Sequence, residues 1–406
     1  MIGELLPILL LQGGYNTTIV CIGAAMLGAA SGMAGSFALL RKRAMVSDAI
    51  SHATLPGVCL GFIAALWFIG AGRSLPFILA GAALSAMAGV VLVDLVRRSD
   101  RLGEDSAIAV VLSTFYGLGM VLLSYIQTLP TAGQAGLEGM LLGATAGMLR
   151  FEAEMIAIAA LVLLVVTILL FKELGLVCFD PEFARAGGWP VRLLDLLIMS
   201  LVTGVVVIGL KTVGLVLIVA LLVIPPAAAL YWSRRLAPMV FTAALIAAVG
   251  AYVGAAISAS APDLPTGPVI VLTLAALFVF NLLFAPKRGL VVATIALVRH
   301  RMTIAERQGL LALATRRSVS QPLSRVLLLR RGWMDAAGNA TTGGLSQARL
   351  VQRDQMLWDR YLLDYPEDAF ACREWSMRFI EEVLPGDLVA ELDRRTVEAS
   401  LRTGGV

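Results

Sequence analysis

The sequence predicts an all-α polytopic membrane protein that carries a small α-rich domain at its C-terminal end. Of its 406 residues, 59% are hydrophobic and only 15% are charged, whereas soluble domains have roughly 45–50% apolar and about 25% charged residues. The mean hydropathy is +0.86, and most of the length is apolar, so we expect lipid to surround it. The formal net charge of +4 does not by itself indicate a nucleic-acid partner.

Nine segments are long and apolar enough to cross a bilayer, which takes about 20 mostly apolar residues in a helix. Lys211 and Gly214 mark a tight turn between the sixth and the seventh, which alternatively form one broken helix, so we expect eight to ten spans. The nine predicted spans are residues 15–40, 44–70, 76–96, 105–127, 152–171, 191–209, 213–231, 236–258 and 267–285.

Basic residues orient these spans. With nine spans, each cluster of Lys and Arg falls on one side, and the positive-inside rule makes that side cytoplasmic. Composition changes sharply after residue 286. We therefore divide the chain into a transmembrane domain, residues 1–289, and a cytoplasmic C-terminal domain, residues 290–406, which is long enough for a small core of its own.

The second predicted span contains an ionisable pair, although charge inside a span costs about 2.5–3.5 kcal/mol per group on insertion scales. Asp48 and His52 are four residues apart and share one helical face. In a helix that starts near Arg41, His52 lies roughly 16 Å along the axis, close to the bilayer midplane.

Two interpretations of this pair are open. In the first, Asp48 and His52 satisfy each other and fix helix packing. In the second, which we favour, they bind a divalent metal on a transport path, because a carboxylate oxygen and a neutral imidazole suit manganese, iron or zinc. Two ligands are too few for a tight site, and two copies across a dimer axis would supply four.

Neighbouring residues are candidates for a supporting role. Ser47 and Ser51 are predicted to orient the two ligands through hydrogen bonds, although small-residue helix packing explains them equally well. Pro56 and Gly57 follow, and they are predicted to break or kink the helix near the site.

The stretch LLRKRAMVSDAISHATLPGVCLGF (39–62) resembles the permease subunits of bacterial metal-ion ABC importers, which carry manganese, zinc or iron. That family typically reads G-D-A-x-S-H-A-x-L-P-G here, and Ser47 replaces the first glycine. The stretch FDPEFARAGGWPV (179–191) and the apolar residues 209–229 resemble the family's coupling segment and next helices. The resemblance covers roughly residues 10–287.

This resemblance implies a dimeric permease of the bacterial plasma (inner) membrane, formed with a second copy or a paralogue. It implies two further partners, a cytoplasmic ATP-binding subunit and an extracytoplasmic metal-binding solute-binding protein. The family's aspartate and histidine are taken to coordinate the metal, which carries over onto Asp48 and His52. We expect no permanently bound cofactor, only the transported metal.

The candidate coupling segment also reads as a capped surface helix from its residues alone. An aspartate cap, a proline at the first helical position and a carboxylate in the first turn are typical of a helix start. The alternative is an ordinary connecting helix. The chain has no GxxxxGK[ST] phosphate loop, so we expect no ATPase activity of its own. The predicted coupling residues are Asp180, Pro181, Glu182, Ala184 and Gly187.

The C-terminal domain has helical patterning over residues 304–316 and 322–331, followed by a turn-rich wing and a long amphipathic helix. It looks like the winged helix-turn-helix domain of iron- and manganese-dependent repressors of the diphtheria-toxin-repressor type. Gln355 and Trp375 stand where those repressors have histidines. We therefore expect an appendage that contacts the ATPase or dimerises, and nucleic acid is not an expected partner.

The leading hypothesis is a permease for a divalent metal, and the tail together with the oxygen ligand favours manganese over zinc and iron. One rival is an intramembrane metalloenzyme built on Asp48 and His52. The chain has only two histidines, His52 and His300, and it lacks the HExxH motif of zinc proteases. A second rival is a membrane-anchored, metal-responsive regulator, and a third is a proton- or sodium-coupled carrier.

Overall fold

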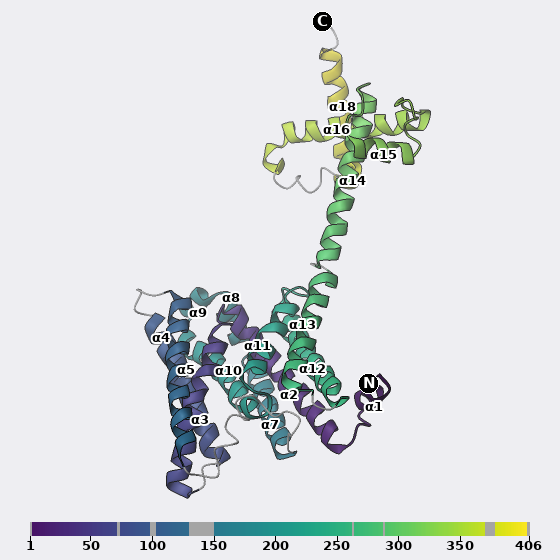
Figure 1. Cartoon of the computed structure of the whole chain (residues 1–406). Coiled ribbons are helices and arrows are strands. Elements are labelled where there is room, and N and C mark those ends of the chain that lie inside the picture. The colour runs from purple at the N-terminus through teal and green to yellow at the C-terminus, as the bar shows by residue number, and fades with distance from the viewer. Residues whose placement is uncertain are drawn as a thin grey trace. The chain divides into compact units, whose positions relative to one another are not determined.

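Helices form nearly all of the regular structure in this computed structural model (Figure 1). The structure describes residues 2–70, 74–97, 103–129, 150–261, 264–286, 289–369 and 378–403. The chain divides into two compact units, Met1–Leu290 and Val291–Val406, one residue away from the expected boundary.

Within the described ranges, eight helices of the first unit are long and apolar enough to cross a membrane. They are α2 (Tyr15–Leu40), α3 (Val46–Ile69), α4 (Leu75–Arg97), α5 (Glu104–Thr128), α7 (Arg150–Leu169), α10 (Val191–Val213), α12 (Leu236–Ala259) and α13 (Thr266–Phe284). Four shorter helices accompany them: α1 (Ile2–Leu9), α8 (Phe171–Phe179), α9 (Pro181–Ala186) and α11 (Leu215–Ala229). The predicted seventh span is α11, whose 15 residues reach only about 22 Å.

The sixth and seventh apolar segments are separate helices joined by a tight turn. Gly214 ends α10 with a φ of 82°, a conformation that glycine adopts without strain. A Cβ on Gly209 of α10 would lie 2.6 Å from the side chain of Ile218 on α11. Residues nine apart in one straight helix are about 13.5 Å apart, so the chain reverses at Gly214.

Close helix packing organises the first unit into two neighbouring groups. The first surrounds α2, which packs against α7, α10, α11 and α12, and the second consists of α3, α4 and α5. The close approach of α2 to α12 requires glycine, since a Cβ on Gly32 would lie 2.6 Å from the carbonyl oxygen of Ala243. Small residues at such crossings are typical of membrane helices.

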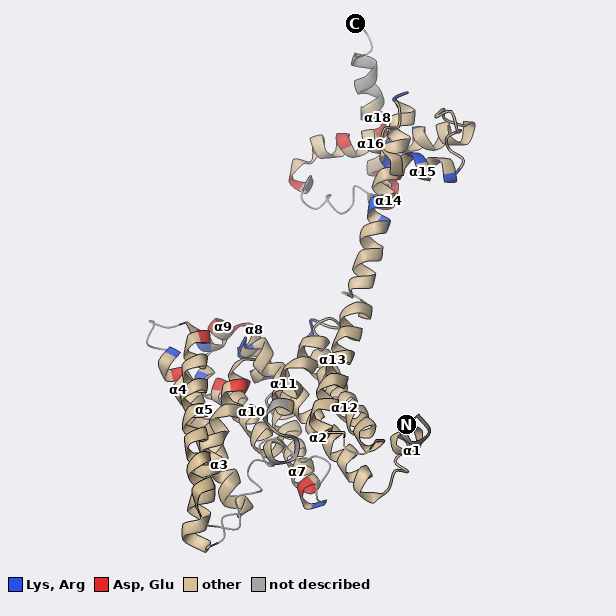
Figure 2. Ribbon diagram, in the orientation of Figure 1, with Lys and Arg blue, Asp and Glu red and all other residues tan. Residues whose placement is uncertain are grey.

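Most of the Lys and Arg residues described in the first unit lie at one end of its helices (Figure 2). We call this end the arginine-rich face and define it by five arginines that line one cavity there: Arg41, Arg43, Arg97, Arg185 and Arg192. The helices α8 and α9 lie at the same end (Figure 1).

The second unit is a small helical domain with its own buried residues. Its helices are α14 (Leu290–Ala314), α15 (Pro322–Arg330), α16 (Thr342–Asp364), α18 (Gly386–Thr403) and the short 3₁₀ turns η3 (Pro366–Ala369) and η4 (Ile380–Glu382). One cluster forms around Leu310, Leu328 and Val351, and another around Trp358. The first helix is longer than the predicted 304–316, because it begins at Leu290.

The predicted wing corresponds to a turn with one isolated antiparallel bridge, between Met334 and Ala340. No β-strand occurs among the residues that the structure describes. Gln355 lies on α16 and donates to Asp359 across 3.0 Å, while Trp375 falls outside the described residues. The second unit is therefore helical, and its likeness to a winged-helix domain stays a prediction.

Candidate functional site

Asp48 and His52 lie on the same face of α3, as their spacing predicts. Nε2 of His52 is 3.6 Å from Oδ1 of Asp48, which is too long for a hydrogen bond. The side chains are 29% and 47% exposed, respectively, whereas the α3 residues beside them, Ser47, Ala49 and Ser51, are buried. The pair therefore faces outward from the chain.

The pair lies nearer to the start of its helix than expected. Lys42 has a φ of 58°, and α3 begins only at Val46. His52 is then about 9 Å along the helix, in place of the 16 Å expected from a start near Arg41. Asp48 falls in the first turn, close to the arginine-rich face.

An aromatic residue from α5 completes the surroundings of the histidine. The ring of Tyr116 meets the His52 ring edge to face, with centroids 5.2 Å apart and an interplanar angle of 89°. His52 Nδ1 is buried and has no hydrogen-bond partner in the described part of the chain. Sequence patterns did not single out Tyr116, because its contact with His52 joins two helices about 60 residues apart in sequence.

The two ligand candidates do not form a complete metal site within one chain. Among the described residues, no group of three or more His, Cys, Asp or Glu side chains could hold a metal ion. Divalent transition metals in proteins usually take at least about four ligands. Any tight site at this place needs ligands from outside the described part of this chain.

Both serines of the motif direct their hydroxyls to the main chain. Ser47 Oγ donates to the carbonyl oxygen of Ala44, and Ser51 Oγ donates to that of Ser47 across 2.9 Å. Both side chains are buried. These contacts fit the interpretation of small-residue helix packing, and an orienting role toward the ligands stays a prediction.

The predicted helix break at Pro56 and Gly57 is wrong. The α3 helix runs without interruption from Val46 to Ile69 with Pro56 inside it. Gly57 has a packing role: a Cβ there would lie 2.2 Å from the carbonyl oxygen of Gly81 on α4. The tight packing of α4 against this part of α3 lies next to the proline, and a kink at Pro56 stays a prediction.

The candidate coupling segment forms the short helix α9 on the arginine-rich face. Asp180 caps it by accepting a hydrogen bond from the backbone N–H of Phe183 across 2.9 Å, and Pro181 occupies the first turn. Glu182 also lies in the first turn, Ala184 is buried, and Gly187 follows the last helical residue. The Phe183 ring is 66% exposed, so α9 presents an aromatic side chain outward.

Comparison with known proteins places the first unit in a family. Residues 15–285 match the ABC 3 transport family. A manganese transport system membrane protein, MntC of Bacillus subtilis, is 43% identical over 298 residues, which are 73% of this chain and 67% of that protein. A zinc transport system membrane protein, TroC of Treponema pallidum, is 35% identical over 295 residues, 73% of this chain and 97% of that protein.

A solved structure shows the same fold. PsaBC from Streptococcus pneumoniae, in complex with a Fab, superposes with a TM-score of 0.62 at 28% identity and covers 72% of this chain and 100% of the compared chain. The match spans more than half of this sequence, and the polytopic helical architecture agrees with it. The chain therefore belongs to the ABC 3 transport family and is the multi-pass membrane permease of an ABC transport system.

Proposed function

We propose that this permease imports a divalent transition metal into the cytoplasm, and that the metal is manganese. Relatives with similar sequences are named as manganese or zinc transport proteins, and manganese is the more frequent name. The oxygen and imidazole donors of Asp48 and His52 suit manganese, zinc and iron. As an ABC permease the chain is not an enzyme, since a separate subunit of such a transporter hydrolyses ATP.

The observation that carries the proposal is the outward-facing pair on α3. Zinc ligands about 2.0–2.2 Å from the metal, at a roughly tetrahedral angle, lie about 3.3–3.6 Å apart. The 3.6 Å between Asp48 Oδ1 and His52 Nε2 is thus a spacing that a small divalent cation can bridge. A second copy of the chain, or a paralogue, would bring two more ligands to the same cation. Coordination that is shared between two chains also suits a transporter, which must release the cation that it binds.

We further propose that the arginine-rich face is cytoplasmic and that the α9 helix contacts the ATP-binding subunit there. The positive-inside rule supports the orientation. The capped helix and the exposed ring of Phe183 support the contact. On the opposite side we expect a metal-binding solute-binding protein to deliver the cation, and lipid to cover the outer helix surfaces.

We propose that the second unit is a cytoplasmic, winged-helix-like appendage that contacts the ATPase or dimerises. Its order of helices and its turn with an isolated bridge support this likeness. Nucleic acid is not a proposed partner. Trp358, for example, is 1% exposed and donates through Nε1 to the carbonyl oxygen of Arg378, so it packs inside the domain.

The test is metal uptake into vesicles that contain the assembled transporter, with manganese, zinc and iron supplied separately. The proposal predicts that manganese accumulates, and that accumulation requires ATP and the ATPase subunit. Uptake that continues without ATP would point to an ion-coupled carrier. ATP-dependent uptake of zinc or iron in preference to manganese would overturn the assignment of the metal.

A further inference from the structure

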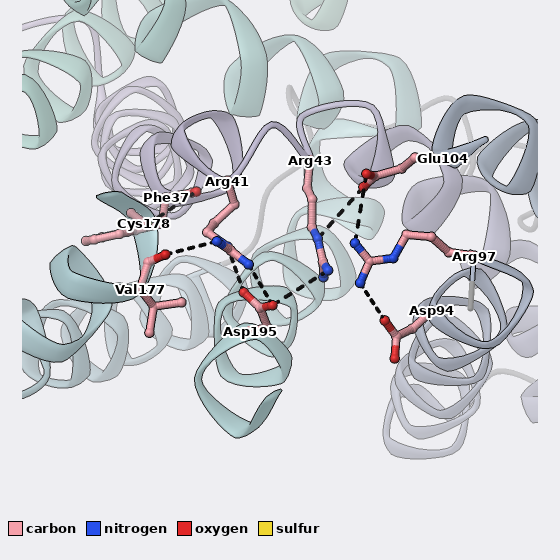
Figure 3. Close-up of polar contacts among 9 residues, drawn as sticks. All are labelled: Phe37, Arg41, Arg43, Asp94, Arg97, Glu104, Val177, Cys178 and Asp195. Atoms are coloured by element: carbon pink, nitrogen blue, oxygen red, sulfur yellow. Dashed lines mark hydrogen bonds and ion pairs between the residues drawn. The ribbon is translucent and has the colours of Figure 1, made fainter. Parts of the chain in front are cut away.

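A cluster of ion pairs on the arginine-rich face joins the two sides of α9 to the start of α3 (Figure 3). The guanidinium of Arg41 donates from Nη1 to the carbonyl oxygen of Val177 across 2.9 Å, and from Nη2 to Oδ2 of Asp195 across 2.8 Å. Its Nε also lies 2.8 Å from Oδ1 of Asp195. This second contact is an ion pair without hydrogen-bond alignment.

A second arginine shares the same carboxylate. Nη2 of Arg43 lies 3.6 Å from Oδ2 of Asp195, and its Nε lies 3.9 Å from Glu104 at the start of α5. Arg97 of α4 is in turn 3.9 Å from Glu104 and 3.0 Å from Asp94. Figure 3 shows these groups as one connected series.

The centre of this cluster is largely buried. The side chains of Arg41, Arg43 and Asp195 are 15%, 11% and 16% exposed. Burial lowers the pKa of Arg43, and the neighbouring Asp195 raises it. One carboxylate thus offsets two buried guanidinium groups, and its removal leaves both without that compensation.

The groups of this cluster come from segments on both sides of α9 and from the turn before α3. Val177 lies in α8, just before α9, and Asp195 lies in the first part of α10, just after it. Arg41 and Arg43 lie between α2 and α3, and Asp48 follows five residues after Arg43. One guanidinium therefore holds both flanks of α9 against the turn that leads into the helix of Asp48 and His52.

A large cavity adjoins the cluster on the same face. Its volume is about 970 Å³, and its lining includes Arg41, Asp195 and Pro181 of α9. The lining also includes Asp94 and Arg97 of α4, so the cavity lies along most of the series of charged groups. Beside this cavity, Arg41 connects the segments that precede and follow α9 to the turn before α3.

We propose that Asp195 is a positioning residue that transmits movement of α9 to α3, by holding Arg41 and Arg43. This inference rests on the proposed function, in which α9 contacts the ATP-binding subunit. When the ATPase moves α9, the base of α10 moves with it, and the paired arginines carry the start of α3 along. The orientation of Asp48 and His52 then follows the state of the ATPase.

The experiment compares metal uptake with ATP hydrolysis in the same liposomes. The complete transporter is reconstituted with wild-type chain, with Asp195→Asn, or with Asp105→Asn as a matched control. Asp105 is an exposed carboxylate in the first turn of α5. The asparagine at 195 keeps the side-chain size but removes the charge that holds the arginines. Manganese ions are the transported probe, and phosphate release measures hydrolysis.

The proposal predicts that Asp195→Asn hydrolyses ATP while the number of manganese ions taken up per ATP falls about tenfold. Asp105→Asn keeps the wild-type ratio. An unchanged ratio in Asp195→Asn overturns the inference, as does a loss of uptake that matches the loss of hydrolysis, because both fit a purely structural ion pair. A wild-type transporter that takes up no metal with ATP instead overturns the proposed function.

A second variant decides the question if Asp195→Asn fails to reach the membrane. Arg41→Lys keeps the positive charge, but the single ammonium nitrogen lacks the planar fork with which Arg41 donates to Val177 and Asp195 from separate nitrogens. The proposal predicts a lowered uptake-to-hydrolysis ratio for this variant as well. A wild-type ratio in Arg41→Lys contradicts it.

Discussion

His52 presents Nε2 to Oδ1 of Asp48 at 3.6 Å, one helical turn away on α3, and neither group hydrogen-bonds the other. A pair that existed only to satisfy itself would be expected to close to hydrogen-bond distance. The observed gap, with both side chains partly exposed, leaves room for a cation between them. This relationship favours the transport interpretation, which the uptake measurements below test.

The contact between Tyr116 and His52 predicts a modest effect on metal affinity. Edge-to-face aromatic pairs contribute about 0.5–1.5 kcal/mol. Tyr116→Ala should therefore raise the manganese concentration at half-maximal uptake by about two- to tenfold. Tyr116→Phe keeps the ring and should behave as wild type. Equal loss in both variants would assign the effect to the hydroxyl group and not to the ring contact.

The cap on α9 predicts a difference between two substitutions of Asp180. Alanine removes the acceptor for the Phe183 N–H and should destabilise the first turn by about 0.5–2 kcal/mol. Serine caps helices almost as well. We expect ATP-dependent uptake to fall in Asp180→Ala and to be retained in Asp180→Ser. If the two variants transport alike, the cap does not support the contact with the ATPase.

The crossing of α3 and α4 predicts a stability effect at Gly57. A methyl group there would lie 2.2 Å from the carbonyl oxygen of Gly81, and overpacking of this kind costs about 1–3 kcal/mol. Thermal unfolding in detergent should therefore begin at a lower temperature for Gly57→Ala. Gly204→Ala on α10 is the matched control, because no atom of another described segment lies within 4 Å of its added methyl group. Identical unfolding curves for the two variants would show that the close contact between Gly57 and Gly81 does not limit the stability of the protein.

The buried contacts of Asp354 are expected to stabilise the second unit. It is 4% exposed, pairs with Arg307 and accepts from the backbone N–H of Ile380 across 2.7 Å. Removing one partner of a buried pair costs about 3–5 kcal/mol, so Asp354→Ala in the full chain should make this unit sensitive to limited proteolysis. Asp359→Ala, at an exposed site on α16, should leave digestion unchanged.

Metal uptake tests whether that unit is an appendage. If the unit is an appendage, Asp354→Ala still imports manganese. Loss of import together with the protease sensitivity would instead make the second unit part of the transport machinery.

Sequence patterns predicted the helices of the first unit well, because long apolar runs have few structural alternatives in lipid. The shared face of Asp48 and His52 also followed directly from their spacing. The residue at which α3 begins could not be predicted from the sequence. Arg41 to Arg43 look like the basic flank of a helix, yet Asp195, about 150 residues later, binds them outside it.

The other differences also come from contacts between distant segments. Pro56 predicts a helix break when α3 is considered alone, and the packing of Gly57 on Gly81 is visible only in three dimensions. Tyr116 carries no motif of its own. Asp195 did offer a signal, since it is a carboxylate near the start of an apolar segment, and such a charge usually has a partner.

The most direct test of the transport site is manganese uptake by Asp48→Asn and His52→Gln variants at membrane levels matched to wild type. Both substitutions keep side-chain size while weakening metal coordination. Each variant should lower ATP-dependent uptake at least about tenfold, since even the loss of a ligand's outer hydrogen-bond partner costs about 10–100-fold in metal affinity. Normal uptake in both variants would contradict this expectation and would make the pair a packing feature of α3.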